Sequence, residues 1–156
     1  MSKQPAVDKT SIPPVASVFE ELLKALPDGV ATLRYEHQST DENYVYLIPT
    51  NPGAAKIAAR GGGSLRYEVI IGENTLYEIM PDKKHLGRSA VEALQAICLA
   101  VFAGHFEETI YSFRKTVTRT VGRLTVDGEE FTTRAVHEFY PLIPKKKQII
   151  KYAAYF

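Results

Sequence analysis

The sequence predicts an α+β fold in which a curved, largely antiparallel sheet packs on a long buried helix. An amphipathic helix is indicated near the N-terminus, and residues 89–103 read as a second helix that is almost wholly apolar. Three long stretches of strand-like sequence follow, between Thr109 and Phe156. Residues 1–14 are polar and end in Ile12-Pro13-Pro14, which predicts a flexible tail. Because 156 residues suit one hydrophobic core, we expect a single domain over residues 15–156.

The N-terminal helix is predicted from apolar residues that recur three and four positions apart and so share one face: Val15, Val18, Phe19, Leu22, Leu23 and Leu26. Two hairpins are then predicted from alternating apolar and polar residues, the first over residues 30–37 and 44–48 and the second over residues 65–71 and 75–80. Between the hairpins, residues 54–60 predict a short helix, and the three glycines that follow predict a flexible connector.

The second helix has a clear start, since Ser89 and Glu92 have the spacing of a capping box. Its interior leaves almost no polar face, so we expect it to be covered on more than one side. Cys98 lies inside this apolar run and is the only cysteine, so no internal disulfide can form. We interpret it as a small core residue, because an apolar environment disfavours the reactive thiolate.

The C-terminal third predicts strands over residues 109–126, 131–142 and 148–155, with a tight turn at Asp127-Gly128. The apolar alternation of the first strand changes phase at Gly122, which predicts a β-bulge there. Strands of this length must coil, so we expect a half-barrel wrapped around the second helix.

The candidate binding residues are Tyr111, Lys115, Arg119 and His137. With a bulge at Gly122, Arg119 would lie opposite Ala135, and His137 would share the inward face of the sheet with the other three. Aromatic walls, two cations and a neutral imidazole suit a small acid as ligand. The alternative interpretation is a histidine at the sheet rim among extended basic side chains.

Other site types lack their residue patterns. The four histidines and the single cysteine have no metal-ligand spacing, and the glycine run does not match a phosphate-binding loop, so we expect neither metal nor cofactor. The net charge of +1 argues against nucleic acid, although residues 114–151 hold nine Lys or Arg and four Asp or Glu. No apolar run is long enough for a membrane span and no secretory signal is visible, which favours a cytoplasmic protein.

Two classes of function follow from these observations. The first is a non-catalytic binding or assembly protein that holds a ligand or partner on its curved sheet. It would be a homodimer, in which Tyr152 and Tyr155 could form the subunit contact. The second is a small pocket enzyme that acts on an anionic molecule, with His137 as general base. The sequence leaves open whether there is any catalysis.

Overall fold

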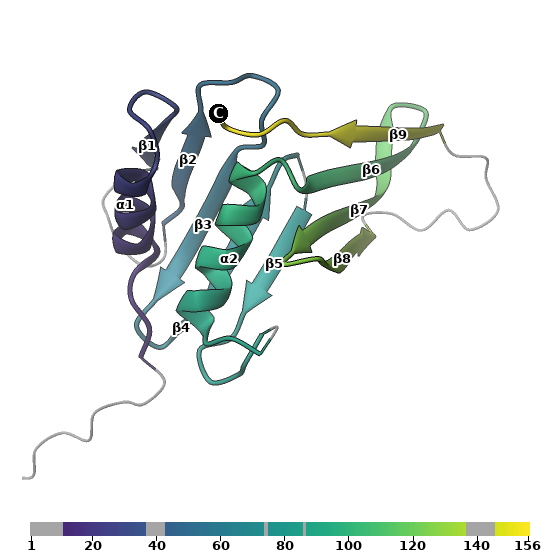
Figure 1. Cartoon of the computed structure of the whole chain (residues 1–156). Coiled ribbons are helices and arrows are strands. Elements are labelled where there is room, and N and C mark those ends of the chain that lie inside the picture. The colour runs from purple at the N-terminus through teal and green to yellow at the C-terminus, as the bar shows by residue number, and fades with distance from the viewer. Residues whose placement is uncertain (1–10, 37–42, 74, 86, 137–145) are drawn as a thin grey trace, which may run out of the picture.

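Two antiparallel sheets, rather than one, make up the β-structure of the protein (Figure 1). The computed structural model describes residues 11–36, 43–73, 75–85, 87–136 and 146–156. These contain two helices and nine strands in an α+β arrangement, and both sheets are open. The C-terminal strands do not form the predicted half-barrel around one helix, since they make one open sheet of four strands that is separate from the sheet of the first five strands.

The first sheet is a five-stranded meander in which each strand pairs with the next along the chain. Its strands are β1 (Ala31–Tyr35), β2 (Val45–Pro49), β3 (Ile57–Gly62), β4 (Leu65–Ile71) and β5 (Thr75–Ile79). Helices α1 (Val15–Ala25) and α2 (Ala90–Phe102) both lie on one face of this sheet (Figure 1). The main core lies between this face and the helices, because apolar side chains from the sheet and from both helices join in one buried cluster.

The two helices differ in how they begin and what they bury. Helix α1 starts after Pro14 without a side-chain cap and buries Phe19 completely. Helix α2 is capped by Ser89, whose hydroxyl oxygen accepts a hydrogen bond from the backbone N–H of Glu92. The expected near-complete cover of the second helix is not found. Leu99 remains 55% exposed, because the second sheet lies beside only part of the helix surface.

Residues 54–60 do not form the predicted short helix. Ile57–Gly62 is strand β3, the centre of the first sheet, and it pairs with β2 on one side and β4 on the other. Its alanines favour a helix by intrinsic propensity, but burial between two neighbouring strands overrides that preference. The predicted flexible connector is also wrong. Gly61 lies in this strand with a φ of 121°, and a Cβ there would stand 2.1 Å from the carbonyl oxygen of Arg66.

The second sheet has the order β8-β7-β6-β9. Its strands are β6 (Phe106–Phe113), β7 (Thr116–Val126), β8 (Glu129–Val136) and β9 (Lys146–Lys151). The long first strand of the prediction is thus two strands, β6 and β7, joined by a turn at Arg114 and Lys115. Both turn residues have positive φ, 47° and 67°, as a two-residue hairpin of the I′ type requires. Asparagine or glycine usually marks such a turn, and neither is present here.

The register of the β7–β8 hairpin is confirmed next to its turn, where Val126 lies opposite Glu129 and Leu124 opposite Phe131. The bulge predicted at Gly122 is wrong. The pairing continues without a shift, so that Arg119 lies opposite Val136 and not opposite Ala135. The irregularity of β7 falls instead in its pairing with β6, between Tyr111 and Ser112.

Gly122 has a packing role. A Cβ at this position would lie 2.2 Å from the side chain of Thr75, at the start of β5, so a glycine lets the two sheets approach. Next to it, Glu108 of β6 is fully buried. The carboxylate of Glu108 accepts hydrogen bonds from the Thr75 hydroxyl and the Glu73 backbone N–H, each at 2.7 Å, and from the Tyr152 hydroxyl at 2.6 Å. We call this group the Glu108 clamp. It joins the β4–β5 turn of the first sheet to the second sheet.

The tyrosines that we expected at a subunit contact are used inside the molecule. Tyr155 is 3% exposed, and its hydroxyl donates to the backbone carbonyl of Ala55 at 2.7 Å. The ring of Tyr152 stacks on that of Phe106, with centroids 5.4 Å apart, while its hydroxyl belongs to the Glu108 clamp. Tyr155 is therefore not available to a second copy of the chain without rearrangement, whereas Tyr152 is half-buried.

Candidate functional site

A row of three side chains crosses the second sheet near its outer end, where the β6–β7 hairpin extends away from the first sheet (Figure 1). Tyr111 of β6 lies directly between Lys147 of β9 and Arg119 of β7. Residues paired in this way share one face of a sheet, and neighbouring strands are about 4.8 Å apart, so the row spans roughly 10 Å. It combines one aromatic ring with two cations.

Arg119 is held in place by stacking, and among the described residues it forms no ion pair. Its guanidinium carbon lies 4.1 Å from the centre of the Tyr111 ring, well within the range of a cation–π contact. The side chain is half-buried, and its Nε has no hydrogen-bond partner in the part of the chain that the structure describes. A half-buried guanidinium without a carboxylate carries a desolvation cost, which an incoming anion would offset.

Positive charge continues around the end of the sheet. The described residues 110–120 and 146–150 contain five Lys or Arg and no Asp or Glu: Arg114, Lys115, Arg119, Lys146 and Lys147. None of the five forms an ion pair within the described ranges. Arg114 lies over the ring of Phe113, 5.3 Å from its centre. We call these five residues the basic end of the second sheet.

The structure brings together part of the predicted binding set. Tyr111 and Arg119 are in contact, as a shared face requires, and Lys115 lies exposed in the turn beside them. His137 lies outside the described residues. The face that Tyr111 and Arg119 share is not the inward face that the sequence predicted. Arg119 is five residues from Leu124, whose side chain is in the core, and the unbroken β7–β8 pairing places the two on opposite faces of the sheet.

Lys147 and Arg114 belong to this surface but were not among the predicted site residues. The lysine run at residues 145–147 suggested a solvated turn, and nothing in the pattern indicated that it starts a strand beside Tyr111. A signal existed in the sequence, because the long stretch from residue 109 to residue 121 contains no acidic residue at all.

Among the residues that the structure describes, three further concave regions lie elsewhere. One separates β5 from β8, a second follows the exposed side of α2 around Leu99, and a third lies around His105. None of the three is lined by Tyr111, Lys115 or Arg119. Within the described ranges, no three His, Cys, Asp or Glu side chains gather as a metal ion would require. No described helix has the length and apolar character needed to cross a membrane.

Comparison with known protein families, with curated proteins and with solved structures finds no match for this chain.

Proposed function

We propose that the protein is a non-catalytic binding protein that holds an acidic protein segment on the basic end of its second sheet. The observation that supports this most directly is the set of five cations that lack a carboxylate partner in the described ranges. Surface cations in most proteins are interspersed with acidic residues. A cluster of one sign attracts a partner of the opposite sign and accelerates their encounter.

The spread of the charges favours a macromolecular partner over a small anion. The row of Lys147, Tyr111 and Arg119 spans roughly 10 Å across three strands, and the turn cations lie beyond it. A single small acid would contact only one or two of these groups. A segment with several Asp or Glu side chains would contact them together.

The aromatic residues favour protein over nucleic acid. A protein that binds single strands offers open aromatic faces on which bases stack. Here Arg119 covers one face of Tyr111 and Arg114 lies over Phe113, so guanidinium groups already occupy these positions. Such stacked guanidiniums are well oriented to bind carboxylates in a bidentate manner.

Fluorescence anisotropy with a labelled oligo-glutamate peptide tests this proposal. We expect saturable binding at low ionic strength that weakens as salt is added, because screening reduces the attraction between exposed charges. Arg119→Ala removes charge-assisted hydrogen bonds worth about 1.5–3 kcal/mol, which corresponds to a loss of affinity of roughly tenfold or more. The double variant Arg114→Glu/Lys115→Glu should lower the affinity further.

The matched control is Lys83→Glu/Lys84→Glu, in the exposed loop before α2, which changes the net charge by the same amount. It should bind the peptide nearly as well as the unaltered protein. Equal losses in the two double variants would show that net charge alone is responsible, and would refute a specific surface. Tighter binding of an oligonucleotide than of the peptide would replace the acidic protein by nucleic acid as the partner.

A further inference from the structure

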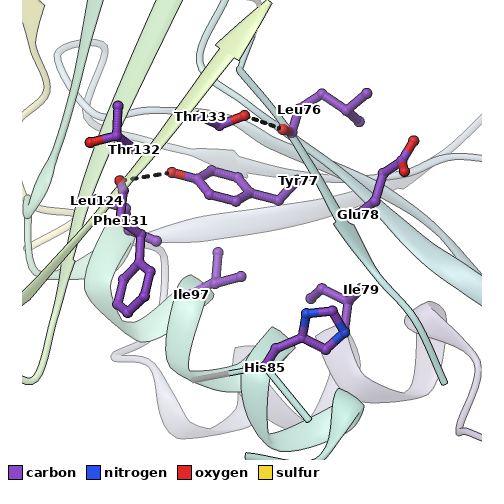
Figure 2. A pocket seen from close by; sticks show the side chains of 10 residues that line it. All are labelled: Leu76, Tyr77, Glu78, Ile79, His85, Ile97, Leu124, Phe131, Thr132 and Thr133. Atoms are coloured by element: carbon purple, nitrogen blue, oxygen red, sulfur yellow. Dashed lines mark hydrogen bonds between the residues drawn. The ribbon is translucent and has the colours of Figure 1, made fainter. Parts of the chain in front are cut away.

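A cavity of about 300 Å³ lies between the two sheets, where strand β5 ends the first sheet and strand β8 ends the second (Figure 2). Ile97 of α2 approaches it from the helix side, and Leu124 and Phe131 of the second sheet form another wall. It occupies the space between the second helix and the C-terminal strands, and it is separate from the basic end of the second sheet.

The cavity exists because the two sheet edges meet through side chains and not through backbone pairing. The hydroxyl of Thr133 donates to the backbone carbonyl of Leu76 at 3.1 Å, and the hydroxyl of Tyr77 donates to that of Phe131 at 3.5 Å (Figure 2). These two bridges hold the edges a side chain apart. A direct strand pair would bring them to about 4.8 Å and leave no space between them.

Most polar side chains of the cavity are hydroxyls, from Tyr77, Thr132 and Thr133. His85 accepts a hydrogen bond from the backbone N–H of Met80 through its Nε2, at 2.9 Å. A neutral ring with this acceptor carries its proton on Nδ1, which can donate to a ligand. Burial, together with the charge of Glu108, raises the pKa of Tyr77, so its hydroxyl stays protonated at neutral pH.

Charge excludes an anion as the occupant. In the described chain no Lys or Arg lines the cavity, while Glu78 stands at its rim with its side chain half exposed. Arg66 pairs with the Glu78 carboxylate at 3.8 Å, so the rim carries little net charge, and an acid would enter a site whose described walls offer it no cation. The apolar walls instead favour an uncharged molecule.

We propose that this cavity binds a neutral, mainly apolar small molecule of one or two rings that carries a single hydroxyl or carbonyl group. Its apolar part lies against Ile97, Leu124 and Phe131, and its polar group meets Tyr77 or His85. A cavity of 150 Å³ holds benzene, so twice that volume holds about a dozen non-hydrogen atoms. The size is at the lower end of the range for small-molecule sites.

The probe pair is 2-naphthol and 2-naphthoate, which share the same rings and differ in charge at pH 7. Titrations followed by calorimetry and by thermal unfolding should show saturable binding of 2-naphthol, with half-saturation below about 1 mM. The binding of 2-naphthoate should be at least tenfold weaker. Absence of saturable 2-naphthol binding, or equal binding of the two probes, would overturn the proposal.

Two variants at Ile97 locate the site. Ile97→Phe fills the cavity and should abolish the binding of 2-naphthol, whereas Ile97→Val enlarges it and should preserve binding. If Ile97→Phe does not fold, Tyr77→Phe tests instead whether 2-naphthol binds at this cavity. It keeps the shape of the wall, removes the hydroxyl, and should weaken 2-naphthol about tenfold. Binding that neither Ile97→Phe nor Tyr77→Phe changes would place the probe elsewhere and refute this site.

Discussion

Glu108 is the most consequential buried polar residue, and replacing it tests how the two sheets are joined. Glu108→Leu keeps a side chain of similar size but removes the acceptor for the Thr75 hydroxyl, the Glu73 backbone N–H and the Tyr152 hydroxyl. A buried donor without a partner costs about 1–3 kcal/mol. Thr75 is 1% exposed and loses its partner fully, while Tyr152 is half-buried and can turn to water. Together with about 1 kcal/mol for each of the two other hydrogen bonds, the free energy of unfolding should therefore fall by about 3–5 kcal/mol.

Glu108→Gln is the matched variant, because it keeps the volume and most of the hydrogen bonds. The amide oxygen can accept from the Glu73 N–H and the Tyr152 hydroxyl, and the amide NH₂ can donate to the Thr75 hydroxyl, which then rotates to accept. Only the charge assistance is lost, so we expect a cost of about 1–2 kcal/mol.

Urea unfolding followed by circular dichroism measures both costs. We expect the leucine variant to lose about 1–4 kcal/mol more stability than the glutamine variant. Equal losses would show that the charge of Glu108 matters and the geometry of the clamp does not. A leucine variant within about 1 kcal/mol of the unaltered protein would mean that the clamp does not hold the sheets together.

Three further predictions concern the interior. Burial raises the pKa of the Cys98 thiol to about 12, so an aromatic disulfide reagent at pH 8 should modify it only after unfolding; rapid stoichiometric modification of the folded protein would contradict this burial. Burial also raises the pKa of Tyr77, Tyr152 and Tyr155 above the value of 10.0 that an unfolded chain has. The stability that these tyrosines contribute is therefore complete below pH 10 and is lost as the pH rises above it. Absorbance measured at alkaline pH should show these three side chains ionising together with unfolding. Gradual ionisation of all nine tyrosines in the folded state would refute this expectation. Gly61→Ala should lower the free energy of unfolding by more than about 2 kcal/mol, because the new Cβ meets the Arg66 carbonyl oxygen. Gly128→Ala has open space around it and should lower that free energy by about 1 kcal/mol, for its positive φ alone. Similar losses of the two variants in urea unfolding would show that the close contact at Gly61 is relieved easily.

Local patterns were sufficient where packing agrees with them. Alternating apolar residues and turn residues predict the two strands of the first hairpin, β1 and β2, and the strands β4 and β5. They also predict the Asp127-Gly128 turn. They failed at β3, because the alanine-rich strand owes its conformation to neighbours on both sides. They failed again at Arg114 and Lys115, where two long cations form a turn that small residues usually make.

The sequence likewise predicted the candidate site only in part. Alternation along one continuous strand places Tyr111 and Arg119 on one face, and they do share a face across two strands. The direction of that face did not follow from the pattern. Thr118 and Thr120 are buried and resemble surface residues in a sequence, whereas Val117 is only half-buried. Threonine is compatible with either face of a sheet, so the choice depends on which surface meets the core.

The β6–β7 turn has a consequence for engineering. Arg114 and Lys115 adopt a left-handed conformation that costs each of them about 1–2 kcal/mol, which Asn-Gly would largely avoid. A redesign for thermostability would therefore select Asn-Gly at these positions. If the β6–β7 turn binds an acidic partner, that gain in stability would come with a loss of affinity for the partner. The strained backbone at Arg114 and Lys115 would then have been retained because the two cations are needed for binding.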